Sequence, residues 1–385
     1  MVAMSANARR LLMYLVENGP TYRADLARSL NLSRATVGNL ANQLMNRGIL
    51  TEEPGSENSL KTSLKATNTL GVFASVVFMR RICAVALATL DGRQVTLDSV
   101  DFSENDDALT RLSCGINFLR KLLECTHTTD NLVGIYLSVD AQVHAESGEI
   151  LQRYSSRWAG VNPKQEFSSS FNAPVVIQNT ARLQGLGESL WGAGKEFTDI
   201  YYVELAYGVA GAHIVHGAIS SGAHGGSGEL GHVVYDWNGP RCTCGNTGCL
   251  TQYVSVPAIL REISILNSDL TTFESILESV RAKDALCMAL IQRVAQIFAQ
   301  ALINVCHLYD PQAVIVSGPL VEAGIGFLDT VRNYVQNHAL SLVAQHVQIL
   351  PSLHIPGDIT VAHAGVASLR KCSAIISPVL EKALK

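Results

Sequence analysis

The sequence predicts an α/β protein in which a small helical domain precedes two α/β lobes. Three observations lead to this fold class. Apolar residues recur at helical spacing near the N-terminus, and after residue 67 buried strand-like runs alternate with helical stretches. The 385 residues also exceed one ordinary hydrophobic core. Because 48% of the residues are hydrophobic and only 16% are charged, the chain can bury sizeable cores and does not have the composition of a disordered protein.

The first domain is expected to span residues 1–66 and to contain a helix-turn-helix. An amphipathic helix is followed by two short helices, which are joined by a tight turn at Asn31 and Leu32. Ser33 can cap the second of these short helices. Two short helices across such a turn have the geometry with which proteins read DNA, the second helix entering the major groove. The polar stretch 51–67 is interpreted as a wing and a linker, or as linker alone.

This geometry gives a set of candidate DNA contacts. Arg34 has the donors to pair with a guanine edge. Residues 1–65 hold eight Lys and Arg against five Asp and Glu, although the whole chain has a net charge of −4, so a basic head precedes an acidic body. A helical interaction module without a DNA role is the alternative. The predicted DNA contacts are Arg23, Ser33, Arg34, Thr36, Asn39, Gln43 and Lys61.

Residues 67–180 and 181–385 are expected to form two related α/β lobes with a cleft between them. The C-terminal helices should return to the first lobe and provide a dimer interface. Helices are predicted near 106–126, 181–192 and 284–308. Strands are predicted at 71–78, 83–92, 131–139, 173–179, 199–208, 211–218 and 311–319, the second of them leading into a third strand near 93–95.

One histidine and three cysteines lie close together in a glycine-rich stretch of the second lobe. Three soft thiolates and one imidazole suit a tetrahedral Zn²⁺ ion. Because four protein ligands fill the coordination sphere, this zinc is expected to be structural. Core thiols without a metal are the alternative. The pattern H-x9-C-x-C-x4-C consists of His232, Cys242, Cys244 and Cys249.

GELGH followed by CTCGNTGCL resembles the signature of the ROK family, which contains repressors, uncharacterised reading frames and sugar kinases. The resemblance continues through LSVDAQVHAESGEIL, SSRWAGVNP, APVVIQNTARLQGLGE and YDPQAVIVSGPL, and so covers nearly the whole chain. It implies a two-lobed, actin-like (ribonuclease H-like) sugar-kinase fold with a zinc-binding loop. The winged helix-turn-helix in front resembles the arrangement of the family's N-acetylglucosamine and xylose repressors.

The resemblance also implies where a kinase would have its catalytic parts, and they are altered here. A glycine-rich phosphate hairpin would fall at 71–77, where Phe73 stands in place of an aspartate. The general base would be an aspartate after Asn179, but Thr180 cannot accept a proton near neutral pH. A second glycine turn is kept in part at 207–211. We therefore expect no phosphoryl transfer and no enzyme activity.

A small-molecule pocket is a further implication of the resemblance. Thr180 and Thr251 stand where carboxylates are expected, which removes hydrogen bonds worth about 1.5–3 kcal/mol each. A sugar phosphate or another anionic ligand would then fit better than a neutral hexose, and a vestigial pocket without an effector is the alternative. His232 would contribute to both the zinc site and the pocket. The predicted effector contacts are Asn179, Thr180, Glu229, His232, Thr251, Gly160 and Asn162.

Together these features predict a cytoplasmic, nucleoid-associated transcriptional regulator of carbohydrate-related genes, most simply a repressor. It would bind a double-stranded DNA operator as a homodimer or homotetramer. No signal peptide is recognisable, and no apolar run reaches the ~18 residues of a membrane span, so no membrane partner is expected. One alternative is a cytosolic ROK sugar kinase with an appended helix-turn-helix. Another is a regulator that is controlled by a protein partner.

Overall fold

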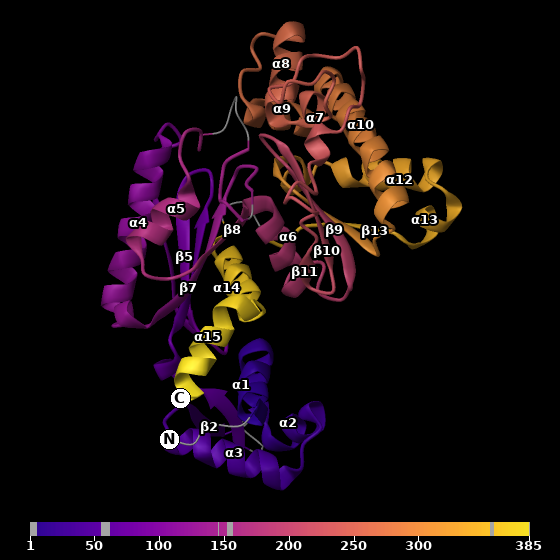
Figure 1. Ribbon diagram of the computed structural model, residues 1–385. Helices are drawn as coiled ribbons and strands as arrows, with labels where there is room; N and C mark the ends of the chain where they lie inside the picture. Colours follow the sequence, from indigo (N-terminus) through magenta and orange to yellow (C-terminus); the bar gives the residue numbers. More distant parts are fainter. Residues whose placement is uncertain (1–5, 55–61, 145, 152–156, 355–357, 385) are drawn as a thin grey trace.

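The computed structural model describes residues 6–54, 62–144, 146–151, 157–354 and 358–384. Lys61, one of the predicted DNA contacts, lies outside the described residues. Figure 1 shows a small head at one end of the molecule and two larger lobes beyond it. Helix α15, near the C-terminus, lies beside the head.

Helices and a small antiparallel sheet make up the described part of the head. The cap of the last helix is formed as predicted, because the Ser33 hydroxyl accepts a hydrogen bond from the Thr36 amide at 3.0 Å. Asn31 takes a left-handed φ of 52° and forms the turn that precedes this helix. Strand β1 was not predicted, since two residues are too few to show an alternating pattern. The elements are α1 (Ala6–Asn18), β1 (Thr21–Tyr22), α2 (Arg23–Leu30), α3 (Arg34–Asn46), β2 (Leu50–Pro54) and β3 (Thr62–Ala66), with the strand order β1-β3-β2.

The first lobe is built on a five-stranded mixed sheet of order β6-β5-β4-β7-β8. Its first three strands form an antiparallel meander, and β7 and β8 are parallel to β4. Side chains of β4 are buried on both faces, as the unbroken apolar run predicts. The elements are β4 (Val72–Phe78), β5 (Ile82–Thr89), β6 (Gln94–Asp101), α4 (Ala108–Cys125), β7 (Leu132–Val139), α5 (Pro163–Ser170) and β8 (Val175–Asn179).

The second lobe repeats this arrangement with the strand order β11-β10-β9-β12-β13. Again three antiparallel strands are followed by two parallel ones, so the repeat that is weak in the sequence is plain in the topology. The predicted strands and the long helix near 284–308 are confirmed. The elements are α6 (Thr180–Leu190), β9 (Asp199–Leu205), β10 (Val209–Val215), β11 (Ala218–Ile219), α10 (Ala285–Tyr309), β12 (Ala313–Ser317), α12 (Phe327–His338) and β13 (Gln348–Pro351).

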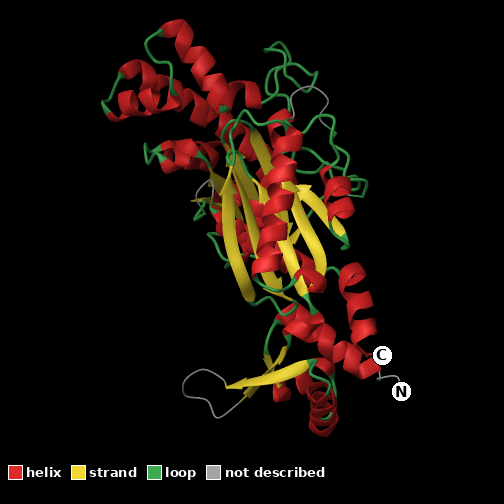
Figure 2. Cartoon of the chain, turned by 90° about the vertical axis from the view of Figure 1, so that its left-hand side faces the viewer, coloured by secondary structure: helices red, strands yellow, loops and turns green. Residues whose placement is uncertain are grey.

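Shorter helices complete the described chain. The last two α-helices return to the first lobe, where α14 packs on β4, β5 and β7. The opposite face of this sheet is covered by α4, which lies in front of the strands in Figure 2. These helices are α7 (Thr251–Val254), α8 (Val256–Leu266), α9 (Phe273–Arg281), α11 (Pro319–Glu322), α13 (Ser341–His346), α14 (Ala362–Arg370) and α15 (Ser373–Leu384). The 3-10 turns are η1 (Asn68–Leu70), η2 (Thr129–Asn131), η3 (Leu230–His232) and η4 (Ile359–Val361).

Helix α10 is long and apolar enough, by length and composition, to be counted as a candidate membrane span. Its side chains Ile291, Phe298 and Leu302 are instead buried in the core of the second lobe. A buried core helix passes the same test of length and hydropathy, so this feature is weak support for a span.

One apolar core joins the head to both lobes. It contains Leu12 of α1, Phe73 of β4, Leu186 of α6 and Leu380 of α15. Two further cores fill the outer faces of the two sheets. The head is therefore packed against the body through α1 and α15, and does not hang from it by a linker alone.

Candidate functional site

Helix α3 presents a polar face to solvent. Its inner face is apolar and buried, with Val37, Leu40 and Leu44 in the head core. On the outer side the predicted DNA contacts Ser33, Arg34, Asn39 and Gln43 are exposed, and Thr36 is half-buried. The hydroxyls of Ser33 and Thr36 lie 2.8 Å apart and are already bonded to each other.

Arg23 has partners inside the head. Its Nε donates to Glu52 Oε1 at 2.9 Å, and its Nη2 donates to Asn42 Oδ1 at 3.2 Å. A longer contact of 3.4 Å reaches the Gly38 carbonyl. The guanidinium thus ties α2 to α3 and to β2, which gives Arg23 a role in holding the head together in addition to the predicted role in DNA binding.

His232, Cys242, Cys244 and Cys249 come together in the second lobe. Their four ligand atoms all lie within 4.8 Å of one another. Cys242 Sγ is 3.7 Å from His232 Nδ1, and Cys244 Sγ is 3.6 Å from Cys249 Sγ, so none of these thiols is in a disulfide. Sulfur and imidazole donors at such distances can hold a metal ion.

Turns in the loop that contains the cysteines bring these four residues together. A hydrogen bond from the Cys242 amide to the Asn246 carbonyl, 2.8 Å long, turns the chain back so that Cys244 meets Cys249. Gly248 has a φ of 69°, and a Cβ at this position would collide with the Asp236 carbonyl. Burial opposes ionisation of Cys242, but hydrogen bonds from Cys244 and His232 outweigh it and lower the pKa of this thiol.

The predicted pocket residues Asn179 and Thr180 form the start of α6. Asn179 Oδ1 accepts from the amides of Ala181 and Arg182, at 2.9 and 3.4 Å, and its Nδ2 donates to the Ala141 carbonyl at 3.0 Å. Thr180 is buried, and its hydroxyl donates to the Phe78 carbonyl at 3.1 Å. Both side chains therefore secure α6 to the first lobe.

A buried arginine connects α6 to Glu229. Arg182 is 3% exposed and lies 3.4 Å from the Glu229 carboxylate. It also donates to the carbonyls of Gly225 and Ser227, at 2.6 and 2.5 Å. Burial raises the pKa of Glu229, while Arg182 and His232 act in the opposite direction. Glu229 directly precedes η3, which ends at His232, so this carboxylate stands between α6 and the cysteine cluster.

The remaining predicted pocket residues lie on other segments. Thr251 is half-buried at the start of α7, and its carbonyl accepts from the Ser255 hydroxyl at 2.6 Å. Asn162 caps α5 through its Oδ1, and its Nδ2 donates to the Ser147 carbonyl at 3.0 Å. Gly160 is exposed just before it, with a φ of 81°.

Two side chains meet between the turns of the two lobes. Arg80 lies in the turn between β4 and β5, and Tyr207 lies in the turn between β9 and β10. The Arg80 guanidinium carbon is 3.3 Å from the centre of the Tyr207 ring, and Glu104 binds the same guanidinium at 2.8 Å. Tyr207 begins the stretch 207–211, in which the resemblance places a second glycine turn, whereas the hairpin predicted at 71–77 is the single strand β4.

Carboxylates lie in the same region. Burial, together with the nearby charges of Asp140 and Glu322, raises the pKa of Glu204 on β9 to about 7. Phe73, which stands where the resemblance expects an aspartate, is fully buried near the start of β4, at the opposite end of that strand from the turn that contains Arg80. The negative charge of these carboxylates opposes binding of a polyphosphate in this region.

The chain matches the ROK family over residues 84–362. It belongs to the ROK family. The xylose repressor of Bacillus subtilis is 26% identical over 354 residues, covering 90% of each chain. The glucokinase of Halalkalibacterium halodurans is 26% identical over 229 residues, covering 56% of this chain and 69% of the kinase. A solved ROK family transcriptional regulator, described as a homolog of E. coli MLC, has a TM-score of 0.77 and 21% identity over 98% of both chains.

Several residues that shape the ROK body were not found from the sequence. The sequence did contain a signal for Arg182, because it lies on the apolar side of a predicted helix. A guanidinium that is buried there requires hydrogen-bonding partners. Arg80, Tyr207 and Glu204 gave no signal of this kind. Their contacts depend on how the two lobes face each other, which no local pattern specifies.

We predict that Glu204→Gln stabilises the protein increasingly as the pH rises from 5 to 8. The folded-state pKa of about 7 lies above the ordinary 4.5, so the unfolded chain ionises first and the fold is penalised as pH rises between these values. The penalty is about 1.4 kcal/mol for each unit of pKa difference. Urea unfolding at pH 5, 6.5 and 8 measures the gap between variant and native protein. Glu196→Gln, at an exposed site, is the control, and an equal gap for both variants would contradict the assignment.

Proposed function

We propose that this ROK protein is a DNA-binding transcriptional regulator of carbohydrate-related genes, most simply a repressor. The observation that carries the proposal is the exposed polar face of α3 on a head that precedes a ROK body. Similarity to the xylose repressor extends over 90% of this chain, which is more than the body alone contains, whereas similarity to the glucokinase covers 56%. The alternative is a ROK sugar kinase with an appended head.

The head would act as a winged helix-turn-helix. Helices α2 and α3, with the short turn between them, have the right order, and β2 and β3 would form the wing. Arg34, Asn39 and Gln43 extend from α3 into solvent and would reach base edges, with Ser33 and Thr36 at the helix start near phosphates. Two heads in a homodimer or homotetramer would read the two halves of a pseudo-palindromic operator.

The body would sense a ligand without phosphorylating it. Thr180 cannot serve as a base, and its hydroxyl is bonded to Phe78. Glu229 and His232 remain as the groups with free hydrogen-bonding capacity on the pocket side, and they suit the hydroxyls of a sugar or sugar phosphate. The carboxylates around Glu204 would repel a phosphate group, so a sugar phosphate would bind with its phosphate away from them.

The cysteine cluster would hold a structural zinc ion. His232, Cys242, Cys244 and Cys249 fit zinc because they supply three sulfur donors and one imidazole within one small volume. When bound, the ion would fix the loop between η3 and α7, and thereby the position of Glu229 beside α6. The protein is proposed to work in the cytoplasm, where free thiols persist.

Arg34→Ala is expected to weaken operator binding about tenfold or more, because a lost bidentate base contact costs roughly 1–3 kcal/mol. The measurement is a gel shift of the full-length protein on a duplex that the protein itself selects from a random library. Arg120→Ala removes an exposed arginine from α4 of the body and should leave the affinity unchanged. Undiminished binding by Arg34→Ala would refute the groove assignment.

No sugar-dependent ATP consumption is expected in a coupled assay over a panel of hexoses, pentoses and amino sugars. Absence of a positioned base alone lowers a rate by about 10²–10⁴. Thr180→Asp should not restore turnover, because the buried Phe73 still stands where the resemblance expects the aspartate of the phosphate hairpin. ADP formation that depends on a sugar would establish the kinase alternative.

Metal analysis of the purified protein is expected to find one zinc ion per chain. Cys244→Ser should lower the zinc content and the midpoint of thermal unfolding, because the loop loses one of its four ligands. Cys125→Ser, at another exposed free cysteine, is the matched control and should change neither. Native protein that contains no zinc, or that a strong chelator leaves unaltered in stability, would refute the zinc proposal.

A further inference from the structure

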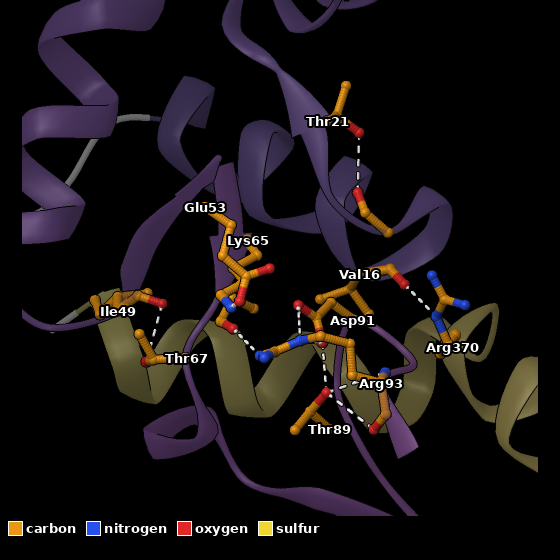
Figure 3. Close-up of polar contacts among 12 residues, drawn as sticks. Val16, Thr21, Ile49, Glu53, Lys65, Thr67, Thr89, Asp91, Arg93 and Arg370 are labelled. Carbon is orange, nitrogen blue, oxygen red and sulfur yellow. Dashed lines mark hydrogen bonds and ion pairs between the residues drawn. The ribbon is translucent and has the colours of Figure 1, made fainter. Parts of the chain in front are cut away.

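The head is attached to the body by specific contacts at the end of α1. One of these contacts is a hydrogen bond to a carbonyl that Pro20 leaves without a partner in the helix. In a continuing helix the Val16 carbonyl would accept from the amide of the fourth residue ahead, which is Pro20 and has no N–H. Arg370 supplies the missing donor, with its Nε 2.7 Å from this oxygen. Figure 3 shows the guanidinium pointing at the Val16 carbonyl.

Arg370 is the last residue of α14, so this bond joins a body helix to the head. A guanidinium at the C-terminus of α1 also complements the partial negative charge of the helix end. The positive charge of Arg370 and its hydrogen bond therefore both act at the C-terminal end of α1. This is also the helix that packs against α15.

The turn between β5 and β6 holds the Arg370 side chain in place. Gly92 has a φ of 87°, and a Cβ at this position would lie 2.7 Å from the guanidinium carbon, so only glycine leaves room for it. The same turn contacts the head a second time, since Arg93 donates to the Ala66 carbonyl of β3 at 2.8 Å. Asp91, 2% exposed, orients Arg93 through contacts of 3.1 Å (Figure 3).

Helix α14, whose last residue is Arg370, also contacts α6 of the second lobe. Helix α14 packs on the first sheet, where a Cβ at Gly365 would collide with the Ser75 hydroxyl. On its other side α14 packs against α6, and a Cβ at Gly187 would lie 4.0 Å from Ala364. Helix α6 begins at Asn179 and Thr180, two of the predicted pocket residues, and we call it the pocket helix for this reason. One helix thus touches the first lobe, the pocket helix of the second lobe, and the head.

We propose that α14 transmits the position of the pocket helix to the DNA-binding head, with Arg370 as the positioning residue at the head end. This inference rests on the proposed regulatory function. A ligand that alters the packing of the two lobes displaces α6 against α14. The displacement reaches Val16 through Arg370 and changes the angle of α1, and with it the direction in which α3 faces DNA. Thermodynamic reciprocity then requires that DNA binding also change α14 and α6.

Hydrogen exchange on the full-length protein tests this without knowledge of the effector. The probe is a duplex selected from a random library by the native protein. With the native chain, the duplex should slow exchange in α3 and also change exchange in α14 and α6, far from the DNA. Arg370→Met keeps the alkyl stem but has no donor. It should keep the α3 protection and lose the response of α14 and α6.

A second pair of variants separates coupling from simple loss of stability. Gly92→Ala leaves Arg370 in the chain but pushes its guanidinium aside, and should reproduce the loss seen in Arg370→Met. Gly324→Ala is the matched control, since Gly324 also has a positive φ, 62°, but has no atom within 4 Å of an added Cβ. It should respond to DNA as the native protein does. Arg370→Lys, with one flexible donor in place of the planar guanidinium, should restore part of the response.

The outcomes distinguish this inference from the function on which it rests. If no duplex is enriched, the regulatory function fails and the inference fails with it. If the duplex protects α3 but leaves α14 and α6 unchanged in the native protein, the function stands and the inference is overturned. It is also overturned if Arg370→Met and Gly92→Ala respond to DNA like the native chain. The operator affinity of Arg370→Met and of Gly92→Ala should differ from that of the native protein by about 5–150-fold, the change in affinity that a typical allosteric coupling produces.

Discussion

Packing of α14 between the two lobes is the contact on which the rest of the architecture depends. Gly365 lets this helix lie directly on the first sheet, where a side chain would collide with Ser75. The other side of α14 meets α6, and its end meets the head. The chain crosses to the second lobe at Thr180 and returns to the first sheet at η4 and α14, and the two lobes also share an apolar core.

Two residues that stand where the resemblance expects a kinase's carboxylates, Phe73 and Thr180, are both buried. A phosphate hairpin requires backbone amides that are open to a ligand. Here Phe73, near the start of β4, is fully buried in the core that joins the lobes, and Thr180 bonds to the carbonyl of Phe78 at the other end of that strand. Phe73 therefore contributes apolar contacts and Thr180 a satisfied hydrogen bond to this lobe. The repeat of strand order in the two lobes remains, because it depends on packing and not on those carboxylates.

Local patterns were sufficient to predict much of the fold, and their limits are equally clear. The apolar run of β4, the cap at Ser33 and the long apolar helix α10 each follow from a few neighbouring residues. The cysteine cluster was also predictable, since its spacing lies within one loop. Contacts between segments far apart in the sequence were not predictable: Arg80 meets Tyr207 only because two lobes face each other, and Arg370 reaches Val16 across more than 350 positions.

A scaffold of this kind can lose its chemistry and still regulate. Phosphoryl transfer needs a base and phosphate ligands placed to within a fraction of an ångström, whereas regulation needs only a ligand that binds two arrangements of the lobes with different affinity. A difference of about 1–3 kcal/mol is enough to change operator occupancy. Arg182 can contribute such a difference without reacting, because its buried guanidinium joins α6 to the Glu229 carboxylate. A sugar that competes for Glu229 would loosen this link, and α6 is the helix on which α14 rests.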